Sequence, residues 1–220
     1  AYEISDYDYI AGLKSFQDGM YQIQDISSML AGEYTAPKAG DTIVDVCGAP
    51  GGKSINAALK MSEQGDCGRV ITRDLSDYKV ALIDENIKRL NITNIQTQVY
   101  DALNCDESLI NKADIVIADL PCSGLGIIGR KPDIKYNASP EKLQSLVDLQ
   151  RDILKVVSRY VKSGGVLMYS TCTINRAENE DNADWICKES GFTKDGEYHQ
   201  LLPANNSGMD GFFVARLIKS

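Results

Sequence analysis

The chain has 220 residues, of which 43% are hydrophobic and 25% are charged, as is typical of a folded globular domain. No apolar run approaches the roughly 20 residues of a membrane-spanning helix, and the sequence shows no secretory leader. We therefore expect a cytoplasmic protein without a membrane partner. The net charge of -8 excludes strong unaided binding to a polyanion such as RNA, unless the basic residues are clustered.

The predicted elements begin with a segment that differs from the rest of the chain. A short alternating pattern at 2–7 precedes a helical pattern over about 24–34. We interpret residues 1–36 as a small N-terminal cap and residues 37–220 as the main domain.

From residue 37 onward, strand patterns alternate with helical patterns. Short β-branched or apolar runs predict strands, and hydrophobic residues at helical spacing predict helices. The strands are expected at 42–46, 69–72, 95–99, 115–118, 166–169 and 211–217, and the helices at 53–61, 78–90, 140–161 and 178–189. This alternation predicts an α/β fold with a mostly parallel sheet and helices on both faces.

A glycine-rich turn, DVCGAPGGKS at 45–54, joins the first predicted strand to the first helix. Glycines let the backbone approach a ligand closely, and a helix start offers free N–H groups. The turn ends in Gly-Lys-Ser like a Walker A loop, but it has Cys47 where that motif requires glycine, and Pro50 lies inside it. The pattern G-x-G-x-x-G is also absent, so the turn indicates a nucleoside site of another design.

Two aspartates follow the next two predicted strands. Asp74 comes after the second strand, where an acid can bind ribose hydroxyls, and Asp101 comes after the third, where it could receive an adenine amino group. Either one alone would more often be a turn residue or a helix cap. Their placement at successive strand ends favours the binding interpretation.

Two cysteines also follow apolar runs: Cys122 in DLPCSG and Cys172 in STCT. In an open α/β sheet, ligands bind outside the carboxyl ends of the strands, so both thiols could converge on one substrate beside Asp119. The alternative is that both are small buried hydrophobic residues. The chain's cysteines include no CxxC pair and it has a single histidine, which argues against a zinc site or disulfides, and no metal is expected.

A basic cluster follows the Cys122 segment. Arg130, Lys131 and Lys135 could hold a phosphate backbone against the site, or they could form a solvated loop.

Taken in order, these segments closely resemble the bacterial RNA cytosine-C5 methyltransferases, the family that includes the Sun and Nop2-like proteins. Within that family the similarity is greatest to the catalytic domain of the 16S ribosomal RNA enzymes. The resemblance runs from about Phe16 to the end of the chain. It is carried by FQDG (16–19), Gln24-Asp25, DVCGAPGGKS (45–54), Asp74, Asp101, DLPCSGLG (119–126), RKPDIK (130–135), STCTI (170–174), Glu178-Asn179 and DGFFVARL (210–217).

The resemblance implies a Rossmann-like methyltransferase fold that uses S-adenosylmethionine, with a seven-stranded sheet whose last strand is antiparallel. It places the cofactor against Cys47, Gly48, Ala49, Pro50, Gly51, Gly52, Lys53, Asp74, Asp101 and Asp119. Relatives carry an N-terminal RNA-binding domain, so we expect this chain to be the catalytic piece of a longer protein. We also expect a monomer whose partner is RNA, contacted by Arg130, Lys131 and Lys135.

The resemblance also implies a reaction. Carbon 5 of cytosine becomes a nucleophile when a thiolate adds at carbon 6. The family assigns this attack to Cys172, contact with the base to Asp119, and release of the product to Cys122. The residues alone leave the reverse assignment of the cysteines open, because DNA cytosine-C5 enzymes attack from a Pro-Cys motif. Two other functions also stay open: the same chemistry on transfer RNA, and an inactive RNA-binding scaffold.

Overall fold

The structure is a computed structural model that describes residues 2–203 and 209–220. Its helices, where η marks a 3-10 helix, are η1 (Ile10–Gly12), α1 (Lys14–Gln17), α2 (Ile26–Thr35), α3 (Gly52–Glu63), α4 (Asp77–Arg89), η2 (Glu107–Leu109), η3 (Leu125–Ile127), α5 (Ile134–Asn137), α6 (Pro140–Val157) and α7 (Glu180–Ser190). Its strands are β1 (Thr42–Asp45), β2 (Arg69–Asp74), β3 (Ile95–Val99), β4 (Ala113–Asp119), β5 (Val161–Thr171), β6 (Phe192–Lys194), β7 (His199–Leu201) and β8 (Phe212–Lys219).

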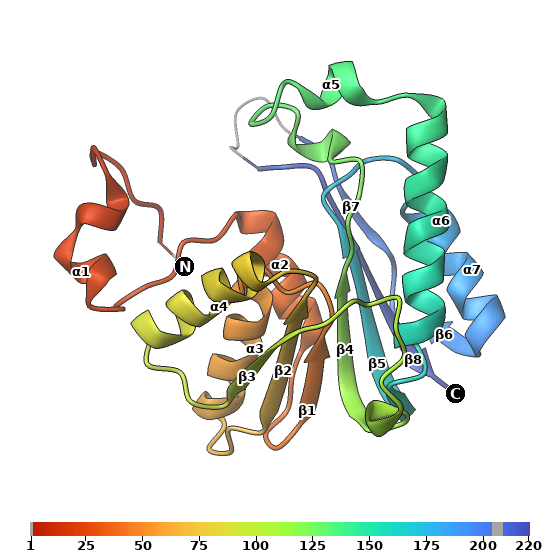
Figure 1. Ribbon diagram of the computed structural model, residues 1–220, viewed down its shortest axis with the longest axis horizontal. Coiled ribbons are helices and arrows are strands. Elements are labelled where there is room, and N and C mark those ends of the chain that lie inside the picture. The colour runs from red at the N-terminus through yellow and green to blue at the C-terminus, as the bar shows by residue number, and fades with distance from the viewer. Residues whose placement is uncertain (1, 204–208) are drawn as a thin grey trace.

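The strands form one sheet with the order β3-β2-β1-β4-β5-β8-β6, and β7 also pairs with β8 (Figure 1). Strands β1 to β5 are parallel, while β8 runs antiparallel to β5. After β3 the chain returns to the centre and places β4 beside β1. This reversal of strand order opens a crevice beyond the carboxyl ends of β1 and β4, where ligands bind in sheets of this kind.

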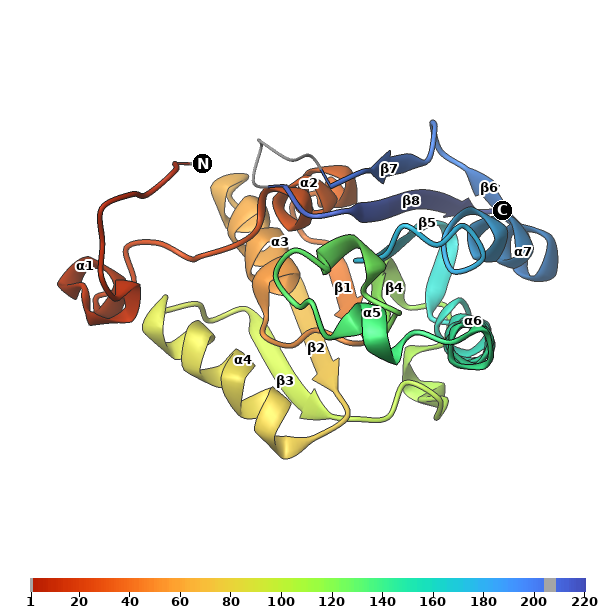
Figure 2. The same cartoon turned by 90° about the horizontal axis from the view of Figure 1, so that it is seen from above.

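Two hydrophobic layers hold the sheet between its helices (Figure 2). Helices α6 and α7 pack on one face through Ile153, Leu154 and Ile186. Helices α2 and α3 pack on the other face, where Ala31 and Met61 meet the opposite side chains of the same strands. The buried strands are therefore apolar on both faces, as in other parallel sheets.

Local sequence sets where the main helices begin. Asp25, Ser76 and Ser139 are the N-cap residues of α2, α4 and α6, and the side-chain oxygen of each accepts a hydrogen bond from a backbone N–H of the first turn. These bonds satisfy donors that the helix itself leaves free. Pro140 is the first residue of α6, where its missing N–H costs nothing.

The segment before α2 lies to one side of the sheet and contacts α4 (Figure 1). Arg89 of α4 donates hydrogen bonds to the carbonyl oxygens of Phe16 and Tyr21, at 3.0 and 2.9 Å, and its guanidinium lies 3.9 Å from the Phe16 ring centroid. Within the described residues, no helix combines the length and apolar character needed to cross a membrane.

The alternating α/β architecture and the antiparallel last strand are confirmed, with several corrections. The sheet contains eight strands in the described part of the chain, where seven were expected. The sequence pattern identified six of the eight strands, and the two that it missed, β6 and β7, have three residues each, too few for a pattern to be recognised. The alternating segment at 2–7 forms no strand, and Tyr2 and Tyr7 are exposed.

The predicted C-terminal end of the longest helix was wrong. We expected a helix over 140–161 and a strand from 166, but α6 ends at Val157 and β5 already begins at Val161. Tyr160 and Val161 are buried, so hydrophobic spacing continues past the end of the helix. Val161 is buried as a strand residue, paired with Ala113 of β4.

Candidate active site

The glycine-rich turn leaves β1 at the reversal point and leads directly into α3. Gly48 donates its N–H to the carbonyl oxygen of Arg73 at 2.8 Å, which holds the turn against β2. A Cβ added at Gly48 would lie 2.3 Å from Cγ2 of the buried Thr72. Gly51 has a φ of +103°, a conformation that other residues rarely adopt. Both glycines are therefore required by the path of the turn.

We predict that Gly48→Ala destabilises the protein by roughly 1 to 3 kcal/mol, because Thr72 is held by its neighbours and cannot move aside. Its hydroxyl donates a 2.7 Å hydrogen bond to Ser54. Denaturant unfolding measures the change. The matched control is Gly129→Ala, where an added Cβ meets nothing within 4 Å, so we expect a change within about 0.5 kcal/mol. Equal stability of the two variants would contradict this account of the turn.

A cavity of about 370 Å³ opens beside the turn. It joins the ends of five strands and brings together most of the residues singled out in the sequence: Cys47, Ala49, Asp74, Asp101, Asp119, Cys122 and Cys172. Tyr100, Leu103, Leu149 and Ile153 add apolar and aromatic walls between them. A cavity with apolar walls and a few convergent polar groups is typical of a small-molecule site.

Asp74 is fixed by the turn that it faces. Its carboxylate accepts hydrogen bonds from the backbone N–H of Ala49 at 3.0 Å and of Leu75 at 2.7 Å, and it pairs with Lys79 at 3.0 Å. Asp101 accepts from the backbone N–H of Leu103 at 3.0 Å and lines the same cavity. The two acids therefore line one cavity, Asp74 from the last position of β2 and Asp101 from just beyond β3.

A second cavity of about 250 Å³ lies on the other side of the turn and shares Cys47, Ala49 and Asp119 with the first. Its remaining walls come from Gly48, Pro50, Gly52 and Lys53 of the turn and from the start of α2, including Gln24, Asp25 and Ser28. Asp45 also lines it and is 1% exposed. Burial raises the pKa of Asp45 to about 7, and its Oδ1 has no hydrogen-bond partner among the described residues.

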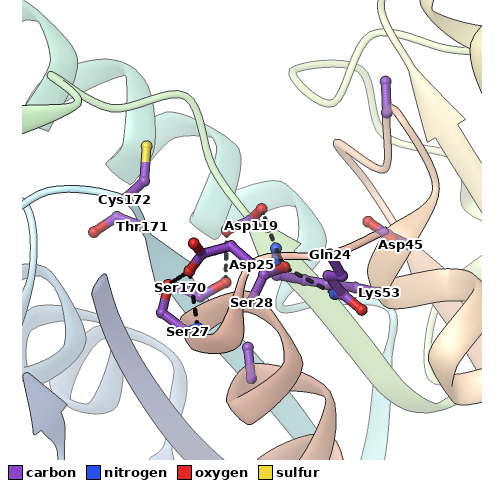
Figure 3. Close-up of polar contacts among 12 residues, drawn as sticks. Gln24, Asp25, Ser27, Ser28, Asp45, Lys53, Asp119, Ser170, Thr171 and Cys172 are labelled. Atoms are coloured by element: carbon purple, nitrogen blue, oxygen red, sulfur yellow. Dashed lines mark hydrogen bonds and ion pairs between the residues drawn. The ribbon is translucent and has the colours of Figure 1, made fainter. Parts of the chain in front are cut away.

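Lys53 and Asp119 form an ion pair between the two cavities (Figure 3). Nζ of Lys53 lies 2.6 Å from Oδ2 of Asp119 and 3.3 Å from the Ser28 hydroxyl. The other carboxylate oxygen of Asp119 accepts a 2.7 Å hydrogen bond from Ser170. The carboxylate thus has a fixed orientation at the end of β4.

The two cysteines meet at the same place. The Sγ atoms of Cys122 and Cys172 are 3.2 Å apart, and both residues line the cavity with Asp119. A hydrogen bond from the Cys122 thiol lowers the pKa of Cys172, while sharing that hydrogen bond raises the pKa of Cys122. Burial raises the pKa of Cys47, which makes that thiol unreactive.

The three basic residues do not share one environment. Arg130 forms ion pairs with Asp25 and with Asp210, the latter at 3.1 Å from its Nε. These two carboxylates offset its positive charge. Lys131 and Lys135 are exposed, and Nζ of Lys135 lies 4.8 Å from the centroid of the Tyr136 ring.

Sequence reasoning missed three residues that the structure brings to the site: Asp45, Ser28 and Ser170. Asp45 carried a signal, since it is an acid directly before the glycine-rich turn, at the end of a strand. Ser170 also carried a signal, since it lies two residues before Cys172 and a strand places such side chains on the same face. Ser28 offered no signal, because only the packing of α2 brings it to Lys53.

The strand order, the glycine-rich turn after β1 and the acids after β2, β3 and β4 define an S-adenosylmethionine-dependent methyltransferase. The chain belongs to the 16S rRNA methyltransferase RsmB/F family, whose model matches residues 33–218. These findings confirm the family, the fold class and the cofactor that the sequence indicated.

Individual relatives agree with this assignment. The chain is 38% identical to the probable ribosomal RNA small subunit methyltransferase B of Bacillus subtilis, over 96% of this chain and 50% of that protein. Among solved structures, PH0851 has a TM-score of 0.89 at 30% identity, covering 98% of this chain and 50% of that one. NSun6 from Pyrococcus horikoshii with SFG has a TM-score of 0.85 at 27% identity, covering 97% and 56%. The chain thus spans about half the length of the curated relatives it matches.

Proposed function

We propose that the chain transfers a methyl group from S-adenosylmethionine to carbon 5 of a cytosine in 16S ribosomal RNA, through a covalent bond between Cys172 and carbon 6. The observation that carries the proposal is the pair of sulfur atoms 3.2 Å apart in one cavity with the Asp119 carboxylate. The family match and the names of the relatives support ribosomal RNA as the substrate.

The residues around the turn fit the cofactor. Asp74 and Asp101 offer carboxylates for the ribose and the adenine, and Gly48 of the turn lines the second cavity. When Asp45 is ionised, its Oδ1 is an acceptor without a donor, which suits the ammonium group of the methionine part. When bound, the cofactor supplies a methyl group on a positively charged sulfur.

The ion pair of Lys53 and Asp119 is assigned to the target base. Asp119 faces the cysteines from the end of β4 and would hydrogen-bond the base near N3, while Lys53 keeps a positive charge beside it. Negative charge develops on the ring when the thiolate adds, so fixed groups at this edge lower the barrier. Ser170 and Ser28 hold the pair in position.

The thiols divide the reaction between them. The Cys172 thiolate forms the bond to carbon 6, which makes carbon 5 electron-rich and able to accept the methyl group. A base must then remove the proton on carbon 5, and the electron pair of that carbon–hydrogen bond re-forms the double bond as the Cys172 thiolate is expelled from carbon 6. Cys122 lies against the sulfur of Cys172 and is assigned to this release step.

Lys131 and Lys135 are proposed to contact RNA phosphates near the cavity. Arg130 would make a third such contact once its ion pairs with Asp25 and Asp210 are broken. Further RNA contacts are assigned to chain outside these residues, because the relatives are twice as long and this chain has a net charge of -8. Residues 1–36 are proposed to form a cap, which contributes Gln24, Asp25 and Ser28 to the wall of the second cavity.

The proposed activity can be tested by incubating the protein with labelled S-adenosylmethionine and 16S ribosomal RNA, followed by nuclease digestion and mass spectrometry. We expect label in 5-methylcytidine. Label in another nucleoside, or in transfer RNA and not in ribosomal RNA, would contradict the proposal. Cofactor binding without transfer to any RNA would favour the scaffold interpretation.

We predict a pH dependence of stability from Asp45. Its carboxyl has a pKa of about 7 when folded and an ordinary value of 3.8, so between these values the folded protein keeps a proton that the unfolded chain releases. The free energy of unfolding therefore falls as the pH rises through this window, by up to about 1.4 kcal/mol per pH unit for this group. Asp45→Asn should become more stable relative to wild type as the pH rises toward 7, and gain nothing above it. Denaturant unfolding of both proteins across this range measures the difference, and a difference that does not vary with pH would refute the assignment.

A further inference from the structure

Glu178 is a buried carboxylate that contacts the Cys122 loop and is not one of the reacting groups. Glu178 precedes α7, has no exposed surface, and takes part in none of the ion pairs formed by the described residues. Its Oε2 accepts hydrogen bonds from the backbone N–H of Ser123 at 2.9 Å and from the Gln150 side chain at 3.0 Å. Its Oε1 accepts from the Asn175 side chain at 2.9 Å. A carboxylate withdrawn from water needs such donors to offset its lost solvation.

Gln150 of α6 completes the arrangement. It also has no exposed surface, and its side-chain N–H groups reach both Glu178 and the carbonyl oxygen of Pro121, the latter at 2.9 Å. Its Oε1 accepts from the side chain of Asn182 at 2.8 Å, which fixes which end of the amide donates. Pro121 and Ser123 are the two neighbours of Cys122. The hydrogen-bonded pair of Glu178 and Gln150 therefore holds the backbone on both sides of this cysteine.

The same region ties the Cys122 loop to the Cys172 loop. The hydroxyl groups of Ser123 and Thr173, the residues after the two cysteines, are 2.7 Å apart. The N–H of Gly126 donates to the carbonyl oxygen of Cys172 at 3.1 Å. These contacts set the distance between the two loops. The hydrogen bonds that join Glu178 and Gln150 to the backbone of Ser123 and Pro121 then fix the position of Cys122 in its loop.

We propose that Glu178 and Gln150 are positioning residues that hold the Cys122 sulfur against the Cys172 sulfur, and that release of the methylated base depends on them. The inference deepens the proposed function, on which its catalytic part rests. Moving Cys122 should slow the release step much more than the attack by Cys172, which loses only the hydrogen bond from the Cys122 thiol. A purely structural role would instead slow both steps together.

The first test needs no RNA. Diamide, a diazene oxidant, converts two thiols into a disulfide while its N=N bond takes up the two electrons and two protons, and the rate of this reaction reports how closely the sulfurs are held. We expect Glu178→Gln and Gln150→Leu to form the Cys122–Cys172 disulfide about ten-fold more slowly than wild type, as followed by peptide mass mapping. The controls are Glu189→Gln and Gln144→Leu, exposed residues on α7 and α6, and both should match wild type. Should Glu178→Gln fail to fold, Gln150→Leu carries the test.

The second test uses the covalent adduct with substrate RNA. In both positioning variants we expect the adduct to form within about three-fold of the wild-type rate and to resolve about ten-fold more slowly. Unchanged disulfide rates, or equal losses in adduct formation and release, would overturn the inference. If neither wild type nor any variant forms an adduct while the disulfide rates differ as expected, the proposed function fails and the placement of Cys122 stands.

Discussion

Replacing Cys172 by alanine is expected to abolish the covalent adduct with RNA and to lower methyl transfer on the order of 10³-fold or more. The thiol of Cys172 is the one whose pKa is lowered, and it lies in the cavity beside Asp119. Without the thiolate, carbon 5 of cytosine stays too weak a nucleophile to accept a methyl group. Transfer of labelled methyl groups to RNA, and denaturing gels that retain covalent complexes, measure the two effects.

The matched control for Cys172→Ala is Cys67→Ala, which removes an exposed cysteine from the loop before β2. It should retain both adduct and turnover. Binding of S-adenosylmethionine to Cys172→Ala should also stay close to wild type, because the carboxylates assigned to the cofactor are untouched. Persistence of the adduct in Cys172→Ala would show that another thiol attacks the base.

Replacing Cys122 by alanine is expected to have the opposite effect on the adduct. The Cys172 thiolate loses the hydrogen bond from the Cys122 thiol but can still add to the base, and the methyl group can still be transferred, whereas the release step loses its sulfur. We expect about one methyl group per protein molecule to be transferred, followed by accumulation of a protein–RNA complex that survives denaturation. Multiple turnover should fall by about 10² to 10⁴-fold, the range for loss of a proton-transfer group.

Gel analysis over time distinguishes this trap from simple inactivation. In Cys122→Ala the band of covalent complex should grow to include most of the protein, whereas in wild type it should stay a minor species. Normal multiple turnover by Cys122→Ala, or absence of any adduct in it, would remove Cys122 from the release step.

Much of the fold could be predicted because each strand of the parallel sheet is a short apolar run that ends in a turn. The run before Asp45 and the runs ending near Asp74 and Asp119 carry this pattern plainly, so the edge of the sheet that holds the site was predicted with its acids. The strands β6 and β7 could not be predicted because three residues do not establish a period, and their identity depends on pairing with β8.

The site was predictable to the extent that its residues follow strands. Cys122, Cys172 and Asp119 were expected to converge, and they line one cavity. The interactions that orient them were not predictable, because they join segments far apart in the chain. Ser28 lies 25 positions from Lys53, and Glu178 lies 55 positions from Ser123, so only the packed structure brings either pair together.

The environment of Arg130 marks another limit of the sequence. A run of basic residues indicates a phosphate contact, but it cannot reveal that acids from the start of α2 and from the segment before β8 meet the first of them. The effective positive charge beside the cavity is therefore smaller than the sequence suggests, and Lys131 and Lys135 carry most of it.

Peptide mapping of a trapped complex tests attack by Cys172 on the base most directly. RNA carrying 5-fluorocytosine in place of the target base, incubated with the protein and S-adenosylmethionine, cannot lose the group on carbon 5 and should remain covalently attached. After protease and nuclease digestion, we predict that the methylated fluoronucleotide is found on the peptide that contains Cys172. Finding it on the peptide that contains Cys122, or on neither peptide, would contradict the account.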